Sequence, residues 1–210
     1  MSYNPVYDEE KWQKMYNRDT VWQGAGPICK AMLYLTNAQS VLDVGCGRGD
    51  FLAFFERHVP SLGVDLSRWM CENKFCESEI KMENCTKMSM GDQSYDLVVG
   101  LDICEHLSSA DLKLMLLEMK RIARKAIVLL PSALLCYENE TELHDSSIDL
   151  AGHLIYWRED RWLDTMSSIL EPEFEFDAEK VIRFTSILER QHCYPGQWRH
   201  IEFFIRRAMP

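Results

Sequence analysis

Three glycines at alternate positions, Gly45, Gly47 and Gly49, form the stretch of the chain best suited to hold a ligand. Glycine tolerates positive φ and lets a ligand approach the backbone closely, because it has no Cβ. Asp43 lies two residues before the first glycine, within the apolar run Val41–Val44. This spacing differs from the G-x-G-x-x-G fingerprint of dinucleotide sites. The stretch therefore predicts a nucleotide-like ligand held by a strand–loop–helix turn, and it disfavours a dehydrogenase.

A second acidic residue, Asp65, ends the apolar run of residues 62–64. α/β cofactor folds place a carboxylate about 20 residues after the glycine loop, where it binds ribose hydroxyls. A carboxylate suits this role because its two oxygens can accept hydrogen bonds from both hydroxyls of the diol. Asp65 is therefore a candidate ribose ligand.

Two histidines are candidates for proton transfer. His106 follows an expected strand over Tyr95–Gly100, and His153 precedes an expected helix around residues 162–170. Imidazole titrates near neutral pH, so it can take a proton from an acceptor hydroxyl or amine. Ligands of open α/β sheets bind outside the carboxyl ends of the strands, so we expect both histidines to face the cleft. The alternatives are a cofactor-contacting or supporting role for His106 and loop-fixing hydrogen bonds for His153.

The elements that must position these residues alternate between short apolar strands and amphipathic helices, which is typical of an α/β fold. The expected strands are Val41–Val44, Leu62–Asp65, Glu79–Met82, Tyr95–Gly100, Ala126–Leu130, Val181–Leu188 and Arg199–Arg206. The expected helices of this part are Asp50–His58, Ser67–Lys74, Ser109–Arg124 and one around 162–170. The Pro-Gly pair within Tyr194–Gln197 predicts a tight turn that joins the last two strands into an antiparallel hairpin.

Residues 1–38 precede this pattern and are rich in aromatic side chains. Helices are expected over Glu9–Arg18 and Pro27–Leu35, the second with proline in its first turn. The aromatic side chains either pack this segment onto the rest of the protein or line a lid over the ligand. They are Tyr7, Trp12, Tyr16 and Trp22. We expect one domain over residues 1–210, with a helical cap at 1–38 and an α/β core at 39–210.

Together these motifs resemble the class I, Rossmann-like methyltransferases that depend on S-adenosylmethionine, and most of all those acting on small molecules and glycans. The stretch from Asp43 to Gly49 is similar to the family's D/E-x-G-x-G-x-G motif, and residues 101–107 resemble its D-V-L-E-H-L segment. The resemblance implies a doubly wound, seven-stranded sheet in the order 3-2-1-4-5-7-6. It also implies an antiparallel last strand and an N-terminal helical lid.

The resemblance further assigns parts of the cofactor to particular residues. It implies that the glycine loop holds the methionine portion, that Asp65 holds the ribose, and that Asn84 and Cys85 meet the adenine. The family commonly has an acid where this chain has Asn84, so this contact would lack charge. The implied cofactor-binding residues are Asp43, Gly45, Cys46, Gly47, Gly49, Asp65, Leu66, Asn84, Cys85 and Leu101.

The function expected from the resemblance is methyl transfer from S-adenosylmethionine to an oxygen, or secondly a nitrogen, of a small molecule or glycan. The reaction is an SN2 displacement that releases S-adenosylhomocysteine. One alternative is a protein or RNA methyltransferase with a basic face from the arginines of the last strands. These are Arg183, Arg190, Arg199, Arg206 and Arg207. Another alternative is a non-catalytic subunit that binds the cofactor.

Composition narrows the choice of partners. The net charge of −10 argues against a sequence-independent nucleic-acid binder, because such affinity comes from Lys and Arg. The eight cysteines form no C-x-x-C pair and are expected to be reduced thiols, with no metal site. No membrane-spanning or signal segment is expected, which favours a cytoplasmic protein. The sequence leaves the oligomeric state open.

Overall fold

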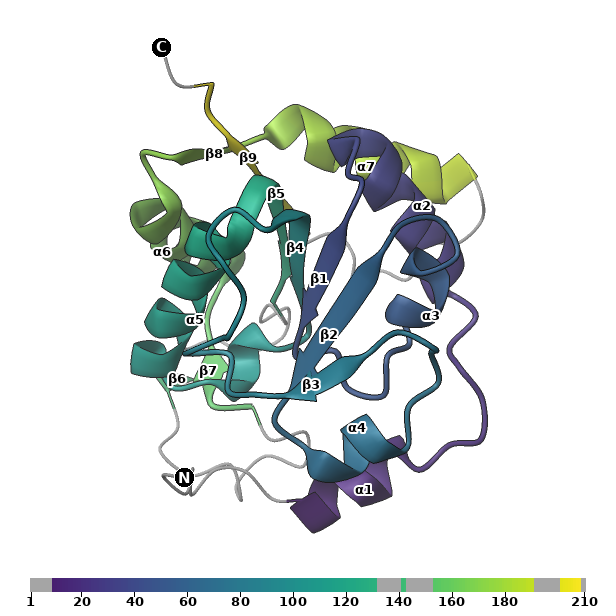
Figure 1. Cartoon of the computed structure of the whole chain (residues 1–210). Helices are drawn as coiled ribbons and strands as arrows, with labels where there is room; N and C mark the ends of the chain where they lie inside the picture. The colour runs from purple at the N-terminus through teal and green to yellow at the C-terminus, as the bar shows by residue number, and fades with distance from the viewer. Residues whose placement is uncertain (1–8, 132–140, 143–152, 191–200, 209–210) are drawn as a thin grey trace.

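The structure of the chain is a computed structural model that describes residues 9–131, 141–142, 153–190 and 201–208. Seven strands form one sheet in the order β3-β2-β1-β4-β5-β9-β8, which corresponds to the predicted 3-2-1-4-5-7-6 (Figure 1). The strands of this sheet are β1 (Val41–Val44), β2 (Ser61–Asp65), β3 (Ile80–Met82), β4 (Tyr95–Leu101), β5 (Ala123–Leu130), β8 (Phe174–Phe176) and β9 (Glu202–Arg206). As predicted, the last strand, β9, is antiparallel to both neighbours.

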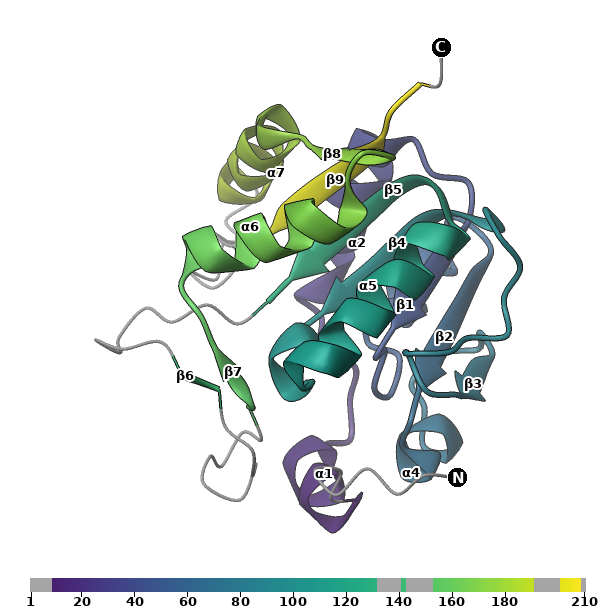
Figure 2. The same ribbon diagram turned by 90° about the vertical axis from the view of Figure 1, so that its left-hand side faces the viewer.

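Helices cover both faces of this sheet (Figure 2). One face packs against α5 (Ser109–Ile122) and α6 (Glu159–Leu170), and the other against α2 (Ala25–Thr36) and α7 (Ala178–Arg190). The central strands are apolar and buried because helices exclude water from both sides. Because helices cover both faces of the sheet, a ligand can bind at the carboxyl ends of its parallel strands.

The expected strand at Val181–Leu188 is wrong, because this segment lies within helix α7. Its buried residues, Phe184 and Leu188, are four apart and share one helix face, where Phe184 packs against Phe203. Strand β8 precedes this helix, so α7 separates β8 from β9 and the two strands do not form the expected direct hairpin. The predicted turn over Tyr194–Gln197 lies outside the described residues.

The remaining elements are short and lie near the carboxyl ends of the strands. They are α1 (Glu9–Tyr16), α3 (Leu52–Phe55), α4 (Arg68–Glu72), the 3-10 helix η1 (Cys104–His106), β6 (Thr141–Glu142) and β7 (Ile155–Tyr156). Ser67 caps α4 by accepting from the Met70 N–H at 3.0 Å, and Ser108 caps α5 by accepting from the Asp111 N–H at 3.1 Å. None of the helices in the described ranges is long and apolar enough to span a bilayer.

The glycine loop leaves β1 in a conformation that side chains rarely adopt. Gly45, Gly47 and Gly49 have φ values of 71°, 55° and 81°. The N–H groups of Gly45 and Cys46 donate to the carbonyl of Val64 at 2.8 and 3.1 Å, which ties the loop to β2. The loop is therefore a fixed cradle at the point where β1 and β2 end.

Two charged residues between and after these glycines hold the N-terminal segment. Arg48 Nη1 donates to the carbonyls of Tyr16 and Arg18 at 3.0 and 2.7 Å. The carboxylate of Asp50 pairs with Arg18 and accepts from the Trp22 N–H at 2.7 Å. The segment that follows α1 is therefore bonded directly to the glycine loop, while α1 itself lies beside α4 (Figure 1).

Replacing Gly45 with alanine should destabilise the fold. A Cβ at this position would overlap the side chain of Ile103, and the positive φ adds strain. We expect the free energy of unfolding to fall by about 2–4 kcal/mol, measured by denaturant unfolding. Gly91→Ala is the matched control, since its φ is not positive and a Cβ added there would meet no atom within 4 Å in the part of the chain that the structure describes. Equal effects of the two substitutions would contradict this explanation.

Removing the Asp50 carboxylate should release the N-terminal segment without unfolding the sheet. In Asp50→Ala, the local opening free energy of residues 9–22 should fall by about 1–3 kcal/mol, because an ion pair and a backbone hydrogen bond are lost. Amide hydrogen exchange of this segment measures the change. Glu72→Ala, which removes a 3.9 Å pair between exposed side chains, should leave that exchange unaltered. Unchanged protection in Asp50→Ala would refute the proposed attachment.

Candidate functional site

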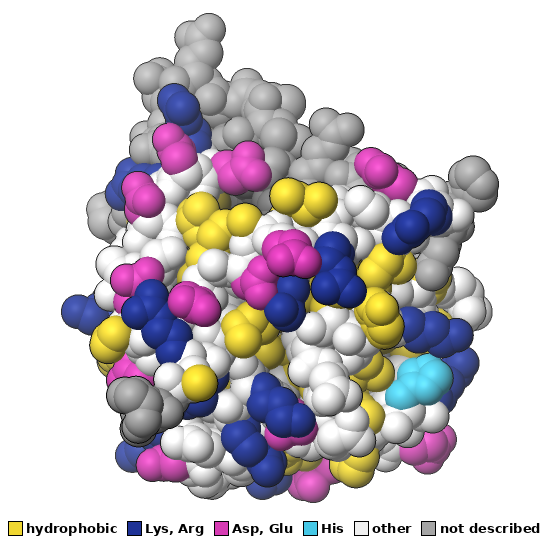
Figure 3. Space-filling view, turned by 90° about the horizontal axis from the view of Figure 1, so that it is seen from above, with side chains coloured by type: hydrophobic (Ala, Val, Ile, Leu, Met, Phe, Trp, Pro, Cys, Tyr) yellow, Lys and Arg dark blue, Asp and Glu magenta, His cyan; other side chains and the backbone are white. Residues whose placement is uncertain are grey.

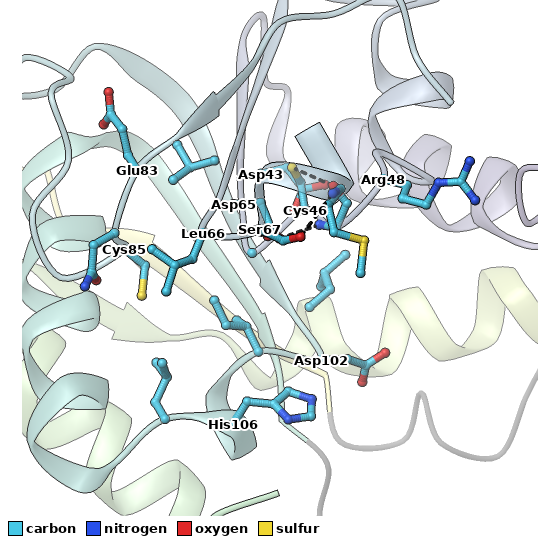
Figure 4. Close-up of a pocket in the computed structure, with 18 of the residues that line it drawn as sticks. Asp43, Cys46, Arg48, Asp65, Leu66, Ser67, Glu83, Cys85, Asp102 and His106 are labelled. Carbon is cyan, nitrogen blue, oxygen red and sulfur yellow. Dashed lines mark hydrogen bonds between the residues drawn. The ribbon is translucent and has the colours of Figure 1, made fainter. Parts of the chain in front are cut away.

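A pocket of about 230 Å³ opens at the carboxyl ends of β1, β2 and β4 (Figure 4). Its walls come from the glycine loop, the residues after β2 and β3, and the segment after β4. Among the residues predicted to bind cofactor or to react, those that line it are Asp43, Gly45, Cys46, Gly47, Asp65, Leu66, Asn84, Cys85, Leu101 and His106. The fold therefore brings together residues that are up to 63 positions apart in the chain.

Gly47 and Gly49 differ in how they serve the loop. Gly47 lines the pocket, and a Cβ added there would meet no atom of the described residues within 4 Å. Gly49 does not line the pocket, and an added Cβ would lie 2.6 Å from the Sγ of Cys76. Gly49 thus lets the loop pack against the protein, whereas Gly47 leaves backbone accessible to a ligand.

Asp43 is buried at the base of the pocket, with only 1% of its surface exposed. Its Oδ2 has no hydrogen-bond partner among the described residues. Burial, followed by the nearby charges of Asp65 and Asp50, raises the pKa of Asp43 to about 8. The carboxyl group therefore holds its proton at neutral pH, and an ammonium group placed beside it would favour its ionisation.

Asp65 joins the glycine loop to the residues after β2. Its Oδ2 accepts from the Gly47 N–H and its Oδ1 from the Ser67 N–H, both at 2.8 Å. Each carboxylate oxygen has two lone pairs, so these bonds leave acceptor capacity toward the pocket. The predicted ribose ligand is thus fixed in orientation by backbone on both sides.

The predicted adenine end is built differently from the expectation for Asn84. The Oδ1 of Asn84 accepts from the N–H and the hydroxyl of Thr86, both at 2.9 Å, so it stabilises a turn. Cys85 lines the pocket, and burial raises the pKa of its thiol to about 12. Leu66 is 40% exposed and also lines the pocket, where it offers an apolar surface for a planar ring.

The two candidate histidines meet, but only one lines the pocket. His106 is in the pocket wall, and the ring of His153 lies beside it with centroids 4.9 Å apart. The N–H of Leu154 donates to the carbonyl of Glu105 at 2.7 Å, which attaches the His153 segment to η1. His153 therefore sits behind His106 relative to the cofactor residues.

Tyr16 and Asp102 add polar groups at the same end of the pocket. Asp102 has a φ of 53° and faces the open pocket, yet surrounding protein atoms raise its pKa to about 6 by desolvation. Burial raises the pKa of Tyr16 to about 12, and the charges of Asp102 and Glu105 contribute to this shift. The Tyr16 hydroxyl thus remains a donor at physiological pH.

The aromatic side chains of the N-terminal segment have different surroundings. Tyr16 lines the pocket, as the lid interpretation expects. Trp22 packs edge-on against Phe51 at 5.8 Å and does not line the pocket. Tyr7 and the side chain of Trp12 lie outside the described part of the chain.

Sequence reasoning did not single out several residues of the pocket. Arg48 and Asp50 line the pocket and alternate with the glycines of the loop. Their place in the loop could have identified them as pocket residues. Glu83 directly follows β3, but its carboxylate accepts from the N–H and hydroxyl of Ser89 at 2.8 and 2.6 Å. A position directly after a strand thus identifies a residue as part of the pocket. It does not show whether the side chain binds a ligand or stabilises a turn.

Comparisons with known proteins agree with this geometry. Residues 41–126 match a family model described as a methyltransferase domain. Phosphoethanolamine N-methyltransferase 3 of Arabidopsis thaliana is 34% identical over 85 residues, which cover 36% of this chain and 17% of that protein. The chain therefore spans only a small part of the length of this curated relative.

Solved structures resemble the chain over most of its length. A putative methyltransferase from an antibiotic biosynthesis pathway of Anabaena variabilis gives a TM-score of 0.59 at 17% identity, covering 89% of this chain and all of that one. A SAM-dependent methyltransferase of Archaeoglobus fulgidus gives 0.58 at 19% identity, covering 88% and 92%. At these identities the likeness concerns the fold.

The family match covers β1 through the start of β5, which includes the glycine loop, Asp65 and the segment after β4. The sheet order and the pocket at its carboxyl edge agree with that match. Residues 41–126 therefore resemble a methyltransferase domain, and the fold of the chain is that of the class I, Rossmann-like methyltransferases, whose cofactor is S-adenosylmethionine.

Proposed function

We propose that the chain transfers a methyl group from S-adenosylmethionine to an oxygen of a small molecule or glycan in the cytoplasm, with nitrogen as the second choice of acceptor atom. The observation that carries this proposal is the convergence, in one pocket, of the glycine cradle, the buried Asp43, the oriented Asp65 and His106. The first three suit a charged nucleoside-like ligand, and the fourth suits an acceptor that must lose a proton.

When bound, S-adenosylmethionine supplies a methyl group on a positively charged sulfur, and the acceptor atom attacks the methyl carbon in line with the sulfur, which leaves. The chain's own task is to align the acceptor and exclude water. Gly47 would allow the methionine portion to lie against the loop, and Asp43 would face its ammonium group. Asp65 would accept from the ribose hydroxyls while Leu66 covers the adenine. Tyr16, held by the contacts of Arg48, would close the pocket over the cofactor.

His106 is our candidate for the general base. An acceptor hydroxyl must lose a proton as its oxygen attacks, and imidazole is the side chain that titrates nearest neutral pH. His106 lies in the pocket wall, whereas His153 contacts its ring from behind. We therefore assign proton transfer to His106 and orientation of its ring to His153.

The charge distribution favours a small acceptor over RNA or protein. Arg206 donates inward to the carbonyls of Lys120 and Ala123, and Arg207 lies 3.2 Å from Glu175. Arg183 lies 3.7 Å from Glu179 on α7. Figure 3 shows Lys and Arg interspersed with Asp and Glu over the described part of the upper face. These arginines therefore do not support a basic docking face.

Binding of the cofactor is the first test of this proposal. Calorimetry should detect binding of S-adenosylmethionine and of S-adenosylhomocysteine, and Asp65→Asn should weaken both. The expected loss is about 1–3 kcal/mol, because one acceptor oxygen toward the ribose becomes a donor. It corresponds to roughly a 5- to 150-fold increase in Kd.

Asp164→Asn is the matched control, since Asp164 is exposed on α6 and does not line the pocket. Its affinity for both ligands should equal that of the unmodified chain. Absence of binding by the unmodified chain would refute the proposed function. Unchanged affinity in Asp65→Asn would refute only the ribose assignment.

Asp43 predicts a proton released on cofactor binding. At about pH 6.5 the carboxyl group is protonated without ligand, because its pKa of about 8 lies higher. The cofactor's ammonium group should lower that pKa and release up to one proton. Calorimetry in two buffers of different ionisation enthalpy measures this release, and Asp43→Asn should abolish it. Equal release by the variant would show that Asp43 only supports the loop.

The same group sets a pH dependence of stability without ligand. The folded-state pKa of Asp43 exceeds the unfolded value of about 3.9, so the unfolded chain ionises first as the pH rises. This group's contribution to the free energy of unfolding should therefore fall between about pH 4 and 8. In Asp43→Asn the free energy of unfolding should lack this part of the decline with pH, as measured by denaturant unfolding at a series of pH values.

A further inference from the structure

Three potential metal ligands meet beside the pocket, at the point where His106 lines its wall. One ligand atom each from Glu105, His106 and His153 lies within 4.8 Å of the other two. Glu105 is 1% exposed, and both histidines are half-buried. No other group of at least three His, Cys, Asp or Glu side chains in the described ranges has this arrangement.

The backbone holds this cluster in place. Glu105 and His106 are consecutive residues of η1, which follows the end of β4. The hydrogen bond from the Leu154 N–H to the Glu105 carbonyl, 2.7 Å long, brings His153 beside them. The two imidazole rings lie 4.9 Å apart at an angle of 64°, so they do not stack face to face. The fold thus presents three ligands from two segments without requiring a rearrangement of the backbone.

The chemistry of this set favours first-row transition metals. Two imidazoles and one carboxylate suit zinc, iron or cobalt better than magnesium or calcium, which prefer oxygen ligands alone. Ligand atoms about 2.0–2.2 Å from an ion are roughly 3 Å apart. The three ligand atoms lie within 4.8 Å of one another, so side-chain rotations that shorten their separations by no more than about 1–2 Å would close the cluster around an ion.

We propose that Glu105, His106 and His153 bind one divalent transition-metal ion at the acceptor end of the pocket. Three protein ligands leave coordination positions open, and His106 places the ion beside the pocket. The role of such an ion rests on the proposed function: it would bind the acceptor oxygen and lower the pKa of its hydroxyl group. With the ion bound, His106 would be a ligand in place of the general base described above, and the proton released by the acceptor would pass to solvent.

Cobalt titration of the whole 210-residue chain tests this proposal. Co²⁺ should bind at one equivalent and give visible d–d absorption without the charge-transfer band of a thiolate ligand. His106→Ala and His153→Ala should each weaken Co²⁺ binding at least tenfold, and Glu105→Gln should weaken it as well. His58→Ala is the matched control, because His58 is exposed on the surface and does not line the pocket.

Calorimetry with S-adenosylhomocysteine on each variant checks that the cofactor pocket is intact. The proposal is overturned if the unmodified chain binds no equivalent of Co²⁺, or if both histidine variants bind it as tightly as His58→Ala does. A thiolate band would also overturn it, since the cysteines would then be the ligands. Cofactor binding without metal binding leaves the proposed function standing, and metal binding without cofactor binding refutes that function alone.

Discussion

The buried carboxyl group of Asp43, placed under a loop that only glycine can build, is the constraint on which the rest of the site depends. Burial raises the pKa of this carboxyl group, whose Oδ2 has no hydrogen-bond partner among the described residues. A nearby cation would therefore stabilise its ionised form strongly. The positive φ of Gly45 turns the chain over this carboxyl group, so that Gly47 faces the pocket and bonds to Asp65. We therefore expect recognition of a positively charged cofactor to begin in the core.

The same loop links the cofactor site to the N-terminal segment. Arg48 and Asp50 point away from the glycine backbone and bind the chain between α1 and α2. These contacts involve backbone carbonyls and one N–H as well as side chains, and they attach the segment that carries Tyr16 to the loop. We therefore expect cofactor binding at the loop and closure of the pocket by Tyr16 to be coupled.

Much of the fold and of the cofactor pocket could be predicted from the sequence, because both depend on local patterns. Apolar runs gave β1, β2, β4 and β5, and the spacing from the glycine loop identified Asp65. The strand expected at Val181–Leu188 failed because a short apolar segment suits either element until its tertiary partners are known. The meeting of His153 with Glu105 depends on a backbone bond between residues 49 positions apart, which no local spacing reveals.

The bond between Leu154 and Glu105 also has a consequence for the evolution of specificity. It fixes residues 153–156 to the end of β4, so the position of His153 does not depend on the length of the chain that leads from β5 toward it. Insertions or deletions between β5 and residue 153 could therefore arise while His153 keeps its place beside His106. Specificity for the acceptor could in this way evolve in a single connection without separating the two histidines.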